Sequence, residues 1–149
     1  MWRLLLAGAL LGLLLQPLRA VAQDECPAGD ATTPEDTTSV LVGEFLANGE
    51  WDRAYEVLHP EAQLRVPRQV FAVARQTDAI RAPLLDVEVF PARIRPTWTW
   101  GVTGGGFTRV AEVPVRVSRA TPIGTPPTVQ IIPLVQRDGC WRWLPPTLP

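Results

Sequence analysis

The chain has 149 residues with 14 basic and 15 acidic side chains, and every basic residue is an arginine, so its formal net charge is −1. A near-neutral chain without a basic run is a poor ligand for nucleic acids and for anionic lipid surfaces. One histidine and two cysteines are too few for a zinc site, and the acidic residues lack the spacing of a calcium loop, so we expect no metal and no cofactor.

The first 22 residues have the three parts of a secretory signal peptide. Arg3 supplies the positive charge, Leu4–Leu15 is an apolar run, and Ala20-Val21-Ala22 offers the small residues that signal peptidase requires. The apolar run is shorter than the roughly 20 residues that span a bilayer. We therefore expect cleavage between Ala22 and Gln23, a secreted or cell-envelope location, and no stable membrane span afterwards. The alternative is a segment retained as an uncleaved anchor.

Two cysteines follow the signal peptide, Cys26 in a polar stretch and Cys140 near the C-terminus. An even cysteine count in an exported protein indicates a disulfide, so we expect the two to be joined. The bond would fasten the flexible N-terminal arm, residues 23–32, to the last strand. The alternative, a reactive thiol, is disfavoured because Asp138 would raise the pKa of a nearby thiol.

Three helices are predicted in the next part of the chain. The first runs from Thr33 to Asn48, because Thr33 can cap it and Pro34 suits the first helical position. The second runs from Trp51 to Leu58, with apolar residues at helical spacing, and is stopped by the His59-Pro60 pair. The third begins at Pro67 and should end at Gln76-Thr77-Asp78.

From Leu84 the apolar residues recur at every second position, which is typical of half-buried strands. Five runs follow one another at residues 84–90, 93–100, 111–117, 129–135 and 140–144. The expected apolar faces of the first and fourth runs consist of Leu85, Val87 and Val89, and of Val129, Ile131 and Val135. Helices followed by antiparallel strands indicate one α+β domain over residues 33–149, with N-terminal helices packed on a curved antiparallel sheet.

Four prolines interrupt these strand patterns. Each removes a backbone donor, so each should mark a sheet edge, a bend or a bulge. They are Pro91, Pro96, Pro114 and Pro133.

The chain resembles the nuclear transport factor 2-like (cystatin-like α+β) superfamily in three stretches: Glu50–Glu61 at the second helix, Val66–Phe71 at the start of the third, and Gln136–Trp143 at the closing hairpin. The resemblance implies a cone in which three helices and a bent sheet enclose an apolar pocket. Members of this superfamily include enzymes, transport factors and binding domains, and many pair through the sheet face, so the fold alone does not determine the function.

Bulky aromatic side chains are the candidates for lining or filling the cone. They are Trp51, Tyr55, Phe71, Trp98 and Trp100. Packing in an ordinary core is the alternative role for Trp98 and Trp100, which should share a strand face. His59, the single histidine, has no accompanying nucleophile motif and is expected to be structural.

We expect a secreted, non-enzymatic binding or accessory domain that holds a small apolar ligand in the cone. One alternative is a small isomerase or hydrolase that uses Asp86 or Glu88 as a buried general base. Another is a pure interaction domain that forms a homodimer through its sheet face. A buried carboxylate beside an open pocket would favour the enzyme, and an exposed apolar sheet face over a filled cone would favour the interaction domain.

Overall fold

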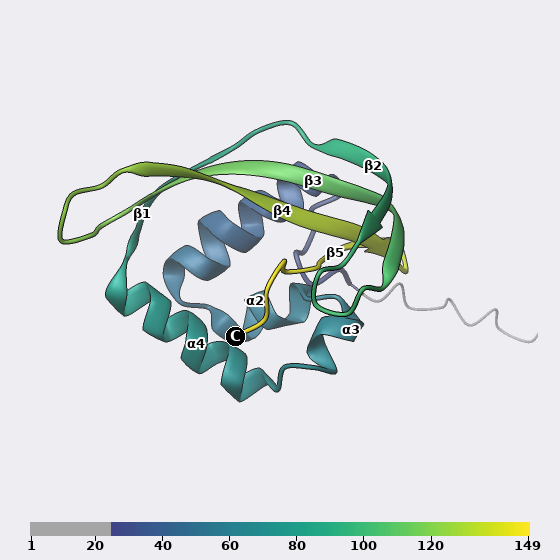
Figure 1. Ribbon diagram of the computed structural model, residues 1–149, viewed down its shortest axis with the longest axis horizontal. Helices are drawn as coiled ribbons and strands as arrows, with labels where there is room; N and C mark the ends of the chain where they lie inside the picture. The colour runs from purple at the N-terminus through teal and green to yellow at the C-terminus, as the bar shows by residue number, and fades with distance from the viewer. Residues whose placement is uncertain (1–24) are drawn as a thin grey trace, which may run out of the picture.

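A curled antiparallel sheet arches over a group of helices in the computed structural model, which describes residues 25–149 (Figure 1). The predicted signal peptide and its cleavage site lie outside the described residues. The helices are α1 (Pro34–Thr38), the π-type helix η1 (Ser39–Leu46), α2 (Trp51–Val57), α3 (Pro60–Gln63) and α4 (Arg68–Arg81). The strands are β1 (Leu84–Val89), β2 (Arg93–Thr99), β3 (Gly106–Arg119), β4 (Pro127–Arg137) and β5 (Cys140–Trp143). The α+β class is therefore confirmed.

The first helical segment begins as predicted. Thr33 Oγ1 accepts a hydrogen bond from the Asp36 amide at 3.0 Å, and Pro34 occupies the first helical position. The helix continues through η1, where Leu41 and Phe45 are fully buried. Gly49 then adopts a φ of 75°, a conformation that glycine reaches without steric cost, and the chain turns into α2.

The short helix α3 was missed in the sequence prediction. Helix α2 ends at Val57, and His59 then caps α3 because its Nδ1 accepts a hydrogen bond from the Glu61 amide at 3.2 Å. The His59-Pro60 pair therefore ends one helix and begins the next, since proline disfavours helix before it and suits the first position after it.

The predicted end of the third helix at residues 76–78 was also wrong, since α4 continues to Arg81. These polar residues do not break the helix. Thr77 donates its hydroxyl to the Val73 carbonyl within it at 2.8 Å, and the helix ends just before Pro83. Phe71 is the buried anchor of α4, whereas its outer side carries the exposed residues Val70, Val73 and Ile80.

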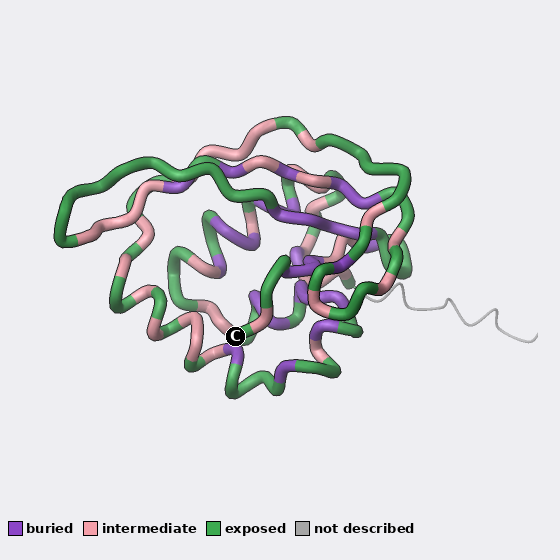
Figure 2. The backbone as a smooth tube through the Cα atoms, in the orientation of Figure 1, coloured by how far each residue is buried: buried purple, intermediate pink, exposed green. Residues whose placement is uncertain are grey.

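The long strand β3 is the centre of the sheet, whose order is β1-β3-β4-β5 with β2 also paired to β3. The C-terminal half of β3 pairs with β1, and its N-terminal half pairs with β2 at the same edge. The core side of β3 carries the fully buried Val113 and Val115, and Ile132 of β4 lies opposite Val113. Figure 2 shows buried stretches along β3 and β4, and an exposed tip where the two strands join.

Two predicted strand faces need correction. A register shift between Leu84 and Asp86 takes Leu85 out of the alternation, so its side chain is exposed. In β4, Ile132 and Leu134 are buried on the core side of the sheet, and Val135, a member of the predicted face, is buried as well. Val129 and Ile131 are exposed because they pair with Arg116 and Pro114, on the opposite face of β3 from its buried valines.

The four prolines lie at positions where no neighbouring strand needs their missing N–H, and for two of them this is the place where a neighbouring strand stops. Pro114 accepts from the Phe90 amide at 2.9 Å, so its missing N–H faces the corner between β1 and β2. Pro133 accepts from the Leu144 amide at 2.9 Å, just beyond the end of β5. Pro96 lies in the edge strand β2, and Pro91 lies in the connection before it.

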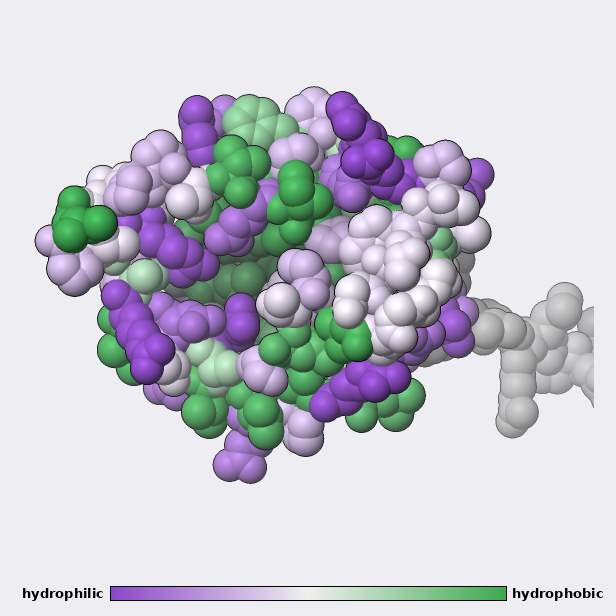
Figure 3. All heavy atoms as spheres, viewed as in Figure 1, coloured by the Kyte–Doolittle hydropathy of each residue, from purple (hydrophilic) through white to green (hydrophobic). Residues whose placement is uncertain are grey.

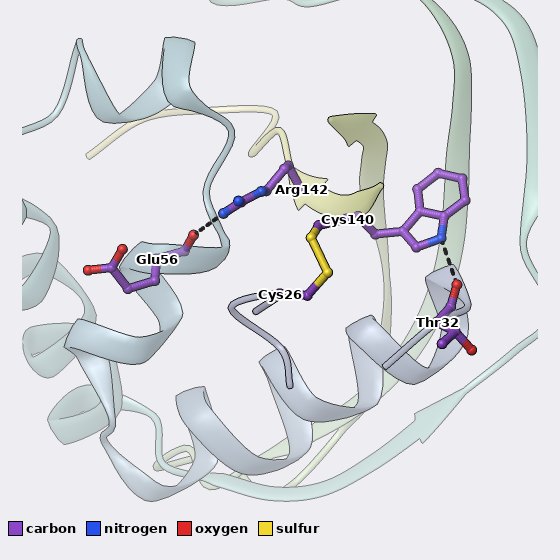
Figure 4. The surroundings of a disulfide bond; sticks show 6 residues. Cys26, Thr32, Glu56, Cys140 and Arg142 are labelled. Atoms are coloured by element: carbon purple, nitrogen blue, oxygen red, sulfur yellow. Dashed lines mark hydrogen bonds between the residues drawn. A yellow bond between two sulfur atoms is a disulfide. The ribbon is translucent and has the colours of Figure 1, made fainter. Parts of the chain in front are cut away.

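A disulfide fastens the N-terminal arm to β5, which confirms the predicted pairing of Cys26 with Cys140 (Figure 4). Their Cα atoms are 5.5 Å apart, inside the range that a disulfide allows. Nearby, the Trp141 indole donates to the Thr32 carbonyl at 3.2 Å, and Arg142 donates to the Glu56 carbonyl at 2.8 Å. A disulfide indicates an oxidising environment of the kind found outside the cytoplasm.

Candidate functional site

The molecule is hollowed between the sheet and α4. Figure 3 shows this hollow, with hydrophobic side chains in its depth and both hydrophilic and hydrophobic side chains around its rim. Two of the cavities that the described residues line lie between α4 and the sheet, one toward η1 and β1 and the other toward β4 and the C-terminal tail.

The first cavity has a volume of about 330 Å³ and a mixed lining. The turn between η1 and α2 contributes Asn48, α2 contributes its first residue, Trp51, and β1 contributes Leu84. Its charged residues are Arg75 and Asp78, which come from α4, and Arg119, which comes from the end of β3.

The second cavity has a volume of about 340 Å³ and a more apolar lining. Phe71 of α4 and Ile132 of β4 form two of its walls, and Trp143 of β5 forms a third. The tail, residues 145–149, runs from β5 to α4 and lines the remaining side (Figure 1). Within this tail Leu148 is partly buried and packs against the core.

Arg75 lines both cavities. Its guanidinium carbon lies 5.7 Å from the centre of the Phe71 ring, and Nη2 lies 3.4 Å from Oδ2 of Asp78. That distance is longer than an ordinary N–H···O hydrogen bond. Among the described residues, the buried Arg75 Nε has no hydrogen-bond partner. The Arg75 side chain is 29% exposed, so its charge is partly withdrawn from solvent and only loosely paired.

Arg119 approaches the first cavity from the opposite side. Its Nη1 donates to the Ala82 carbonyl at 2.9 Å, which satisfies a backbone acceptor at the C-terminal end of α4. This contact holds the guanidinium at the cavity wall. The first cavity therefore carries two arginines and one aspartate, an excess of one positive charge in a chain whose overall charge is negative.

The predicted lining residues divide into two groups. Trp51 lines the first cavity and Phe71 lines the second. Tyr55 is not among the described lining residues of either cavity. It is buried beside Phe71, with ring centres 5.6 Å apart, and its hydroxyl donates to the Val66 carbonyl at 2.9 Å.

Trp98 and Trp100 lie at another part of the sheet, where both contact Phe107 with ring centres 6.4 Å apart. Trp100 follows the end of β2 in a turn, is fully buried, and donates its indole N–H to the Pro145 carbonyl at 2.8 Å. Neither tryptophan is among the described lining residues of the two cavities.

His59 belongs to this aromatic cluster and not to the cavities. Its ring meets Phe107 edge-on with centres 5.4 Å apart, and it is buried at the start of α3. Burial lowers the pKa of His59, and the nearby Glu61 carboxylate opposes this effect only in part. The ring therefore favours the neutral form, in which Nδ1 can accept the capping hydrogen bond.

The carboxylates considered as general bases lie on the outer face of the sheet. Asp86 pairs with Ser118, and Glu88 pairs with Arg116, opposite the face that carries the buried valines of β3. Asp86 is exposed, and Glu88 forms an ion pair with Arg116. Within residues 25–149, no three His, Cys, Asp or Glu side chains form a group suited to holding a metal ion.

The charged residues of the first cavity were not identified from the sequence. Arg75 and Asp78 are three residues apart on α4, a spacing typical of ordinary pairs on a solvated helix face. Arg119 lies near the end of a strand next to a proline-rich loop, and nothing in the sequence relates it to Arg75.

No protein-family model matches the chain, and no curated protein shows significant sequence similarity to it. The chain is similar in structure to a SEC-C motif containing protein from Rhodopseudomonas palustris, whose solution structure is known. The TM-score is 0.54 with 13% sequence identity, and the match covers 82% of this chain and 80% of the other. At this identity the likeness concerns the fold alone. Along the part of the chain that the structure describes, no helix combines the length and apolar character needed to cross a membrane.

Proposed function

We propose that this protein is an extracytoplasmic, non-enzymatic binding domain that holds a small apolar ligand between α4 and the sheet. The observation that carries the proposal is the pair of cavities that adjoin Arg75, with volumes of about 330 and 340 Å³. Volumes of this size are at the lower end of those found for small-molecule sites, which are concave and mostly apolar with a few polar groups. The disulfide supports a location outside the cytoplasm.

We also propose that the domain belongs to the nuclear transport factor 2-like superfamily. The order of elements supports this assignment, since the helices precede a curled antiparallel sheet. A hollow between the helices and the sheet is the arrangement that the superfamily's cone requires.

The placement of Asp86 and Glu88 supports a non-enzymatic role. A carboxylate acts as a general base near neutral pH when burial raises its pKa and the substrate lies within hydrogen-bonding reach. Both residues instead lie on the sheet face that points away from the cavities, and Glu88 is engaged by Arg116.

A second candidate function is pairing through the outer face of the sheet. Val129 is 65% exposed and Ile131 is 45% exposed, and they lie on this face beside Pro114 and Arg116. Sedimentation velocity tests this alternative. A homodimer that Val129→Asp converts to a monomer would support it, and a monomeric protein at high concentration would contradict it.

The ligand-binding proposal is tested with the neutral fluorescent probe N-phenylnaphthylamine, whose emission increases in apolar surroundings. We expect saturable binding of the probe. Trp51→Ala should weaken it if the probe occupies the first cavity, and Leu148→Ala should weaken it if the probe occupies the second. Trp98→Ala is the matched control, because Trp98 is another half-buried tryptophan that is not among the described lining residues. Absence of binding, or an equal loss in the Trp98 variant, would contradict the proposal.

A further inference from the structure

The charges at the first cavity distinguish one class of apolar ligand from the others. Its charged lining residues are Arg75, Arg119 and Asp78, which leave one positive charge in excess. A neutral apolar ligand would cover this charge and remove water from it, which is costly when no counter-charge is supplied. A ligand with one negative charge would supply it.

Arg75 is placed to receive such a charge. Its pairing with Asp78 is long, at 3.4 Å, and 29% of its side chain is exposed. A guanidinium presents donors in a planar fork that matches the two oxygens of a carboxylate. Because its one ion pair is long and its side chain is partly exposed, the Arg75 guanidinium keeps donor capacity at the cavity wall.

The apolar part of the same ligand has a place beside Arg75. The side chain of Arg75 passes the Phe71 ring, which lines the second cavity together with Ile132 and Trp143. A head group at the first cavity and a tail along the second would thus both contact Arg75.

We infer that the ligand is a small monocarboxylate with an apolar tail, whose carboxylate is bound by Arg75 and Arg119 while its tail lies against Phe71. This inference rests on the proposed binding function and adds the charge class of the ligand. A single carboxylate balances the one excess positive charge, whereas a phosphate dianion would exceed it.

The test is competition between N-phenylnaphthylamine and two ligands of equal chain length, octanoate and octanol. We expect Arg75→Gln to weaken octanoate binding about tenfold more than it weakens octanol binding, which is the usual scale for losing a charge-assisted hydrogen bond. Asp78→Asn should strengthen octanoate binding, because it removes the carboxylate that competes for Arg75. A gain of affinity cannot result from misfolding.

Arg81→Gln is the control, since it removes the same charge from the same helix at a residue outside the described lining of both cavities. It should leave octanoate binding unchanged. Suppose that the neutral probe binds, but that Arg75→Gln and Asp78→Asn change the affinity for octanoate and the affinity for octanol by the same factor. The carboxylate inference is then overturned, while the binding function stands. If the neutral probe does not bind, the binding function itself fails.

Discussion

Removing the disulfide should destabilise the domain strongly, because Cys26 and Cys140 are 114 residues apart in sequence. The chain-entropy relation for a closed loop of this length gives about 4–5 kcal/mol, which is a large part of the stability of an ordinary domain. In the folded protein the arm is also held by the buried Ala28 and by the hydrogen bond between the Trp141 indole and the Thr32 carbonyl, and these contacts do not restrict the unfolded chain.

The perturbation is the double variant Cys26→Ala with Cys140→Ala, compared with the oxidised protein by urea unfolding followed through tryptophan fluorescence. The midpoint should fall and the dependence of the unfolding free energy on urea should become steeper, because the unfolded chain without the bond is more expanded. Alanine suits the site because Cys140 is buried, so no new polar group is introduced there. An unchanged midpoint with an unchanged slope would refute the argument that the bond acts by restricting the unfolded chain.

Three further substitutions test individual contacts by the same unfolding assay. His59→Asn should remove a pH dependence of the free energy of unfolding. Because the pKa of His59 is lowered in the folded protein, its contribution to stability is complete above the unfolded pKa of about 6.5 and is lost as the pH falls through the folded pKa. Asparagine keeps the helix cap without titrating, so an equal dependence of stability on pH in both proteins would contradict this prediction. Tyr55→Phe should lower the free energy of unfolding by about 1–2 kcal/mol, since it leaves the buried Val66 carbonyl without its donor. A change smaller than the error of the measurement would show that water replaces the hydroxyl. Phe71→Ala should cost about 3–5 kcal/mol because the side chain is only 2% exposed and contacts the rings of Tyr55 and Trp143; a smaller loss would mean that the tail closes the space.

The elements with strong local signals were predictable. Thr33 with Pro34 marked the first helix, and the alternation of residues in β3 identified its buried face, because capping and two-residue periodicity depend only on neighbouring residues. The disulfide followed from an even cysteine count and the expectation of export.

The faces of β1 and β4 depend on pairing between distant residues and were harder to predict. The register shift beside Leu84 and the pairing of Val129 with Arg116 are set by β3, so no local pattern in either strand reveals them. The candidate site depends on tertiary structure in the same way. It brings Arg75 of α4 and Arg119 of β3 to one cavity, although their spacing in sequence carries no signal.

The disulfide also changes what a protease can do to the chain. Because it joins Cys26 to Cys140, nearly all of the described domain belongs to one covalent ring, including the exposed tip at residues 122–126 between β3 and β4. A single cut of the backbone at that tip would open the ring, but the disulfide would still join the two resulting fragments. The nicked protein would keep β4 and β5 attached to the arm, and the paired strands would remain available to hold the cut ends in place.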